Sequence, residues 1–153
     1  MKLSKKSEYA LRALSRLGTP GAPVQMSIQE LAQQEKIPKK FLEQVLLALK
    51  KAGILHSSRG KTGGYSLQRA PREVSLGEIF RAVDGPVPPL PCMNETSPIT
   101  CPGCPTRENC WLRSTMSEVD QEVTTVLNRV NLVTICRRAT QSRRNLPTPM
   151  YHI

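Results

Sequence analysis

The fold of this chain is decided by residues 27–68, which read SIQELAQQEKIPKKFLEQVLLALKKAGILHSSRGKTGGYSLQ. The stretch opens with a capping box at 27–30, in which serine and glutamate side chains satisfy free backbone amides. This predicts a short helix that runs to about Glu35. Pro38 suits the first position of a second helix, which Gly53 ends. The apolar face of that second helix is formed by Phe41, Leu42, Val45, Leu46 and Leu49.

The rest of this stretch predicts a β-hairpin. Two short strand-like runs, 54–58 and 65–68, flank a glycine-rich basic turn at 59–64. The glycines permit a thin tip, and Arg59 and Lys61 supply cations that can meet phosphate or a narrow minor groove. Helix, turn, helix and hairpin in this order are typical of a winged helix-turn-helix, whose second helix enters the major groove of DNA.

Polar side chains at the start of the second helix can reach base edges in that groove. The positions concerned are Lys39, Lys40, Glu43 and Gln44. Helical spacing of apolar residues also predicts a helix over 4–17, and a second capping box at 75–78 begins another. We therefore expect residues 1–84 to form a winged helix-turn-helix DNA-binding domain.

The charge distribution favours double-stranded DNA as the partner. Residues 1–70 hold 13 Lys and Arg against 4 acidic residues, whereas 71–136 hold 5 Arg against 8 acidic residues. A basic front half suits a polyanion that meets one face of the molecule. No apolar run approaches the roughly 20 residues of a membrane span, and the basic N-terminus leads into an amphipathic pattern, so we expect a cytoplasmic protein. With two histidines and no catalytic pairing or phosphate loop, we do not expect an enzyme.

A proline-rich loop is predicted over 85–110, and it carries Cys92, Cys101, Cys104 and Cys110. Clustered cysteines in a cytosolic chain favour metal ligation over disulfides, and thiolates suit zinc or an iron–sulfur cluster. The two-residue spacing of Cys101 and Cys104 is that of a zinc knuckle. Zinc therefore stays open as an alternative to the cluster, and so do free structural cysteines.

After the loop the apolar residues follow a heptad. Their spacing of four and three predicts one long helix over 111–135 that needs a partner, either its own domain or a second copy of the chain. The basic, proline-containing remainder, 136–153, is expected to be a flexible tail. The predicted fold class is thus mainly α, with a small β-hairpin wing and a long heptad helix. The seam consists of Leu112, Met116, Val119, Val123, Val126, Val130 and Val133.

Four segments resemble the winged-helix iron–sulfur transcription regulators that include IscR and NsrR. They are MKLSKKSEYALRAL at 1–14, FLEQVLLALKKAG at 41–53, SRGKTGGY at 58–65 and FRAVDG at 80–85. The resemblance covers about residues 1–135, and the wing segment is its most specific part. It implies a homodimeric DNA-binding regulator, with the heptad helix as the dimerisation element.

The resemblance also implies roles for individual residues. It implies that the major groove is contacted by Lys39, Lys40, Glu43 and Gln44. It also implies that the wing contact is made by Arg59, Gly60 and Lys61, with Arg59 in the minor groove. The family typically uses three loop cysteines, for which we expect Cys92, Cys104 and Cys110, together with one further ligand. Cys101 is then a spare or the fourth thiolate, and Glu8 is a candidate ligand that reaches across the dimer.

Together these features predict a transcription regulator, a repressor, that senses redox state, nitric oxide or iron–sulfur status. The cluster is expected to be 2Fe–2S or 4Fe–4S. The alternative is a zinc-stapled or cluster-free winged-helix regulator controlled by thiol oxidation.

Overall fold

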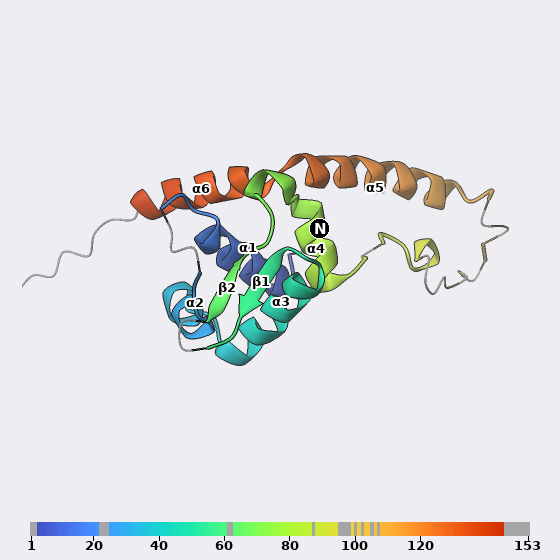
Figure 1. Ribbon diagram of the computed structural model, residues 1–153. Helices are drawn as coiled ribbons and strands as arrows, with labels where there is room; N and C mark the ends of the chain where they lie inside the picture. Colours follow the sequence, from blue (N-terminus) through green and yellow to red (C-terminus); the bar gives the residue numbers. More distant parts are fainter. Residues whose placement is uncertain are drawn as a thin grey trace, which may run out of the picture.

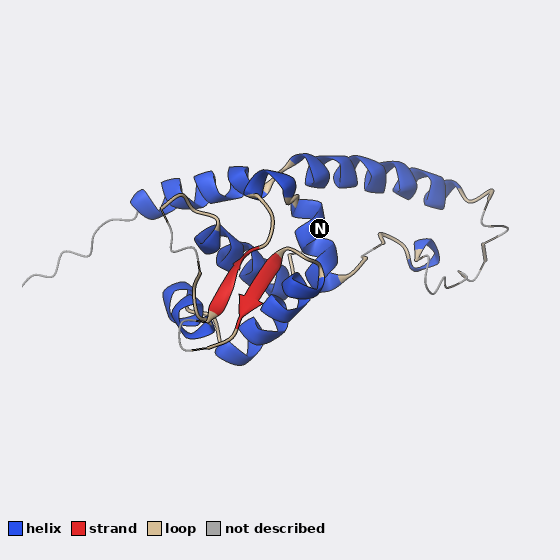
Figure 2. Cartoon of the chain, in the orientation of Figure 1, coloured by secondary structure: helices blue, strands red, loops and turns tan. Residues whose placement is uncertain are grey.

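The computed structural model describes residues 3–21, 25–60, 63–86, 88–94, 99, 101, 103–104, 106 and 108–145. The elements follow in the order α1 (Lys5–Leu17), α2 (Ile28–Glu35), α3 (Lys39–Lys51), β1 (Leu55–Ser58), β2 (Gly64–Leu67), η1 (Pro71–Glu73), α4 (Leu76–Asp84), η2 (Pro91–Met93), α5 (Trp111–Arg129) and α6 (Leu132–Arg144). Helices dominate, with one small hairpin among the described residues (Figure 2). The predicted fold class, a mainly α winged helix-turn-helix, is therefore confirmed.

Helix α1 is the centre of the core. Ser4 caps it by accepting a hydrogen bond from the backbone N–H of Ser7 at 3.0 Å. Ala10, Ala13 and Leu14 lie on its inner face and are fully buried. The helices α3, α4 and α6 pack around this face, so burial of one apolar stripe organises most of the molecule.

The helix-turn-helix is set by local sequence. The capping box of α2 is formed, because Ser27 Oγ accepts from the Glu30 N–H at 3.2 Å and the Glu30 carboxylate accepts from the Ser27 N–H at 2.7 Å. Lys36 ends α2 in the left-handed conformation, with φ +51°. Pro38 then occupies the N-cap of α3 rather than its first position.

The wing is an antiparallel pair whose register runs from Leu55 opposite Leu67 to Ser58 opposite Gly64. A third extended segment supports it. The backbone of Met26 donates to the Tyr65 carbonyl at 3.0 Å and accepts from the Tyr65 N–H at 2.8 Å. The segment before α2 is thereby tied to the wing.

Helix α4 closes the domain against the start of α1. Ser75 caps it by accepting from the Glu78 N–H at 3.1 Å. The Glu78 carboxylate pairs with Arg69. At the other end of α4, Asp84 accepts hydrogen bonds from the hydroxyls of Ser4 and Ser7, each at 2.6 Å.

The single long helix predicted over 111–135 is wrong, because the chain breaks after Arg129 and a new helix begins at Leu132. The break is made by backbone pairing with the segment before α4. The Leu76 N–H donates to the Val130 carbonyl at 2.7 Å, and the Leu132 N–H donates to the Val74 carbonyl at 2.8 Å. Asn131 between them then caps α6.

The prediction of a flexible tail from residue 136 onward is also wrong for residues 136–145. Helix α6 runs to Arg144 and packs against α1, with Leu132 and Cys136 buried. In Figure 1, α6 lies along the body on the side opposite α3, and α5 extends away from the body. Residues 146–153 lie outside the described residues. Among the described helices, none combines the length and apolar content that crossing a bilayer would need.

Candidate nucleic-acid interface and cysteine loop

The four side chains predicted to read bases lie together on the outer face of α3. Lys39, Lys40, Glu43 and Gln44 are all exposed. They are exposed because the opposite face is fixed in the core at spacings of three and four residues. The buried residues of that face are Leu42, Val45, Leu46 and Leu49.

The cations of α3 are available to an external anion. Lys39, Lys40, Lys50 and Lys51 are exposed, and no ion pair ties any of them within the described residues. Glu43 is the one acidic residue of the helix. Exposed cations on a helix of this width suit a groove lined by phosphate.

The wing tip depends on glycine. Gly60 adopts φ +110°, which favours glycine, and it is exposed beside the exposed Arg59. At Gly64 an added Cβ would lie 2.5 Å from the Met26 carbonyl oxygen, and at Gly63 it would lie 2.6 Å from that of Ser58. The tip is narrow because the backbone segments approach this closely. Lys61, the other predicted wing cation, lies outside the described residues.

The loop cysteines form two neighbouring pairs, Cys92 with Cys101 and Cys104 with Cys110. Desolvation, and then a hydrogen bond with the Cys92 thiol, raise the pKa of Cys101. Desolvation, and then a hydrogen bond with Cys110, raise the pKa of Cys104. Cys92 is buried in η2, Cys101 is exposed, and the other two are half-buried.

Cys110 differs from its neighbours because it sits at the N-terminus of α5. The backbone amide of Arg113 is the main cause that lowers the pKa of this thiol. A helix N-terminus stabilises a thiolate in this way, because its free amides and dipole favour negative charge.

The donor set fits a soft metal centre, since four thiols lie within one loop. Their placement does not yet form such a centre. In the part of the chain that the structure describes, no three Cys, His, Asp or Glu side chains lie together closely enough to hold a metal ion. The structure therefore brings together Cys92 with Cys101 and Cys104 with Cys110, and the two pairs lie near enough to interact electrostatically.

Glu8 is half-buried on α1, and its carboxylate is paired with cations of the same helix. It lies 2.7 Å from Lys5 Nζ and 3.5 Å from Arg12 Nη1. The hydrogen bond from Lys5 is the main cause that lowers the pKa of Glu8. None of the loop cysteines is among its described partners.

The predicted dimerisation seam is largely uncovered in the single chain. Val119 is 48% exposed, Val126 is 54% exposed and Val133 of α6 is 46% exposed. Val130 falls at the break between α5 and α6 and is half-buried. Leu112 and Val123 are also exposed, whereas Met116 is half-buried.

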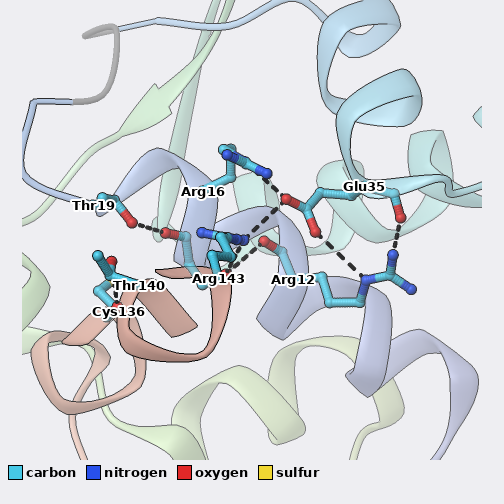
Figure 3. A network of polar contacts seen from close by, with 8 residues as sticks. Arg12, Arg16, Thr19, Glu35, Cys136, Thr140 and Arg143 are labelled. Carbon is cyan, nitrogen blue, oxygen red and sulfur yellow. Dashed lines mark hydrogen bonds and ion pairs between the residues drawn. The ribbon is translucent and has the colours of Figure 1, made fainter. Parts of the chain in front are cut away.

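One group of charged residues was not predicted from the sequence. Glu35 is buried at the end of α2 and is surrounded by Arg12, Arg16 and Arg143 (Figure 3). These residues are far apart in the chain, so no spacing pattern could have grouped them. The one available signal was a carboxylate at a helix C-terminus, where the helix dipole disfavours it.

The chain is similar to known transcription regulators over most of its length. It is 42% identical over 120 residues to the rrf2-like protein of Rhodobacter capsulatus, which covers 76% of this chain and 80% of the relative. It is 30% identical over 145 residues to protein rrf2 of Nitratidesulfovibrio vulgaris, which covers 95% of this chain and 93% of that one.

A solved structure shares the fold. IscR of T. potens superposes with a TM-score of 0.67 at 26% sequence identity, over 94% of this chain and 91% of that chain. Residues 3–138 match the Rrf2 family, described as an iron-dependent transcriptional regulator. These relatives are regulators and not enzymes. The chain therefore belongs to the Rrf2 family of winged-helix transcription regulators.

Proposed function

We propose that this chain is a homodimeric repressor in the cytoplasm whose affinity for a DNA operator is controlled by an iron–sulfur cluster on the loop at 85–110. The observation that carries the proposal is the gathering of four thiols on one loop of a winged-helix regulator. The cluster would report redox state, nitric oxide or iron–sulfur supply.

DNA binding would use the exposed face of α3 and the wing. Lys39, Lys40, Glu43 and Gln44 would face base edges and phosphates in the major groove. Arg59 at the wing tip would enter the minor groove, with Gly60 and Lys61 beside it. The lack of ion-pair partners for the exposed cations of α3, within the described residues, supports this placement.

The dimer would form through α5 and the start of α6. An apolar stripe that is exposed along a helix is costly in water and is covered when a second copy packs against it. A twofold dimer would also present two α3 helices to two half-sites of one operator. The seam residues that would pack are Leu112, Met116, Val119, Val123, Val126, Val130 and Val133.

Cys92, Cys104 and Cys110 would hold the cluster, with Cys101 or Glu8 of a second copy as the fourth donor. A bound cluster supplies redox-active iron and a site that oxygen or nitric oxide attacks. For Glu8 to ligate, its carboxylate must leave Lys5 and Arg12. That exchange of partners on α1 would link the loop to the DNA-binding domain, because α1 packs directly against α3.

The arrangement of the thiols in two pairs favours a second candidate. Without a cluster, Cys92 with Cys101 or Cys104 with Cys110 could form a disulfide. Each pair would lose two protons and two electrons to a peroxide, which would be reduced to water. In this case the chain is a winged-helix regulator controlled by thiol oxidation. In the zinc-stapled alternative, the metal would hold the loop without a sensing role.

Anaerobic purification, followed by an absorption spectrum and by iron, sulfide and zinc assays, separates these candidates. We expect a coloured protein with iron and sulfide in equal amounts, and we expect Cys104→Ala to lose both. Cys136→Ala is the matched control, because this thiol is buried in α6 and outside the loop. A colourless protein with stoichiometric zinc, or with no metal and a reversible disulfide, would contradict the cluster.

The DNA-binding assignment has its own test. We expect Arg59→Ala to weaken binding to a duplex that the wild-type chain selects from a random double-stranded library. Arg72→Ala, in η1, removes the same charge from an exposed position outside the wing. Equal affinities for the two variants at fixed salt would count against the wing contact.

A further inference from the structure

Glu35 is the one charged side chain that is buried among the described residues, at 6% exposure. Its carboxylate forms ion pairs with three guanidinium groups. Arg16 Nε lies 2.8 Å from Oε1, Arg143 Nη2 lies 3.0 Å from the same oxygen, and Arg12 Nε lies 3.5 Å from Oε2. Figure 3 shows the three arginines converging on Glu35, two from α1 and one from α6.

Arg12 and Arg143 also make contacts beyond the Glu35 carboxylate. Arg12 donates a hydrogen bond to the backbone carbonyl of Glu35, and Arg143 Nη2 lies 3.2 Å from the hydroxyl of Ser15. The cluster therefore joins α1, the end of α2 and the end of α6 through one carboxylate.

Two effects oppose a carboxylate at this position. Burial removes its hydration, and the C-terminus of a helix repels negative charge. Arg12 and Arg16 already outnumber the single charge of Glu35, so neutralising it does not require Arg143. The third arginine, which comes from 108 positions further along the chain, instead adds a mechanical connection from α6.

The position of Glu35 in the chain extends this connection to α3. It is the last residue of α2, and only Lys36 and Ile37 separate it from Pro38, the N-cap of α3. Lys36 holds φ +51° and the Ile37 N–H donates to the Ala32 carbonyl at 2.9 Å. A turn this short transmits any displacement of Glu35 to the first residues of α3, where Lys39 and Lys40 lie.

We infer that Glu35 is a positioning residue for α3 and that Arg143 holds it in place, so that the C-terminal helix supports DNA recognition without touching DNA. The inference rests on the proposed docking of α3 in the major groove. It deepens that proposal by making residues on the opposite side of the body, in α6, part of the recognition apparatus.

The matched variants are Arg143→Ala and Arg138→Ala. Arg138 is exposed on the same helix and has no ion-pair partner within the described residues, so its loss removes the same charge and no connection. The probes are the duplex that the wild-type chain selects from a random double-stranded library and a scrambled duplex of equal length and composition. Affinities are measured by fluorescence anisotropy at one salt concentration.

We expect Arg143→Ala to weaken binding to the selected duplex by about tenfold, comparable with the loss of roughly one base-pair contact. Binding to the scrambled duplex should be unchanged, because phosphate contacts remain. Arg138→Ala should match the wild type on the selected duplex. Arg143→Lys should recover part of the loss, and adding Arg143→Ala to Glu35→Gln should cause little further loss, because the first change has already removed the carboxylate that Arg143 holds.

Two results would overturn the inference. Equal effects of Arg143→Ala and Arg138→Ala on the selected duplex would remove the positioning role. Equal weakening on both duplexes by Arg143→Ala, with a salt slope lower by about one, would make Arg143 a phosphate contact instead. A wild-type chain that enriches no duplex would contradict the proposed function itself.

A measurement without DNA keeps the positioning claim testable in that event. Amide hydrogen exchange at Ile37 reports opening of the turn before α3. We expect this amide to exchange faster in Arg143→Ala than in Arg138→Ala, while buried amides of α1 remain alike in the two variants. Identical exchange at Ile37 would contradict a connection between α6 and the turn.

Discussion

At Gly64 the absence of a side chain decides whether the wing can lie against the segment before α2. An added Cβ would meet the Met26 carbonyl oxygen at 2.5 Å, and that oxygen is held by the Tyr65 N–H. We expect Gly64→Ala to lower the free energy of unfolding by about 1–3 kcal/mol, as overpacking does. Urea denaturation measures this.

Ser66→Ala, two residues along the same strand, is the control for Gly64→Ala. Ser66 is half-buried and no hydrogen bond of its side chain is described, so its change should stay within about 0.5 kcal/mol of wild type. Equal stabilities of the two variants would mean that the backbone moves apart freely at this point.

Glu30 gives the stability of the domain a pH dependence of known sign. The hydrogen bond that its carboxylate accepts from the Ser27 backbone N–H is the main cause that lowers its pKa below the ordinary value of 4.5. A carboxyl with a lowered pKa in the folded state stabilises the protein above its unfolded pKa. This contribution is lost as the pH falls through the folded pKa.

We therefore expect Glu30→Gln to be less stable than wild type near pH 7, with the difference shrinking as the pH falls below about 4.5. Thermal unfolding at a series of pH values measures it. Glu43→Gln removes an exposed carboxylate with no ion-pair partner among the described residues, and it should leave stability unchanged at both ends of the series. A constant deficit of Glu30→Gln at all pH values would contradict the mechanism.

Among the elements, α6 depends most on a local signal at its start. Asn131 Oδ1 accepts from the Thr134 N–H at 3.1 Å and from the Thr134 hydroxyl at 3.2 Å. We expect Asn131→Ala to cost about 1 kcal/mol, the usual loss of an N-cap. Asn145→Ala, at the other end of α6, is the control, because the described cap bond there comes from its backbone N–H. Equal losses in thermal unfolding would show that the Asn131 cap does not stabilise α6.

The winged helix-turn-helix could be predicted from sequence because its determinants are local. The capping box at Ser27, the apolar spacing from Leu42 to Leu49 and the glycine turn at 59–64 each act within a few residues. The break between α5 and α6 could not be predicted, because the apolar heptad continues through Val130 and Val133. Backbone pairing with Val74 and Leu76, far earlier in the chain, imposes it.

In the candidate site too, the features set by local sequence could be predicted and those set by distant contacts could not. Exposure of Lys39, Lys40, Glu43 and Gln44 followed from helical periodicity, since a buried face defines an exposed one. The spacing of the cysteines could not say which thiols approach each other, because loop geometry is not periodic. The ion pair of Glu35 with Arg143 could not be predicted from the sequence either, since only the packing of α6 on α1 brings the two residues together.

At the scale of the whole molecule, the exposed seam of α5 is the feature that a single chain leaves unexplained. Val126 is 54% exposed, so replacing it with a charged residue removes little packing within one chain. In a twofold dimer the same change would place two carboxylates in the interface, one from each copy. A monomer would therefore tolerate a charged residue at position 126, whereas a dimer would be weakened by it.

We expect Val126→Glu to raise the dimer dissociation constant by about a hundredfold or more, because an unpaired buried charge costs several kcal/mol. Sedimentation equilibrium measures this, and circular dichroism should show an unchanged helix content. Thr125→Glu adds the same charge at the neighbouring exposed position, which faces away from a heptad seam, and should leave the dimer intact. Operator affinity should fall with the loss of the dimer, because the two half-sites are then no longer bound together. If Val126→Glu and Thr125→Glu sediment alike as dimers, the apolar stripe of α5 serves some purpose other than self-association.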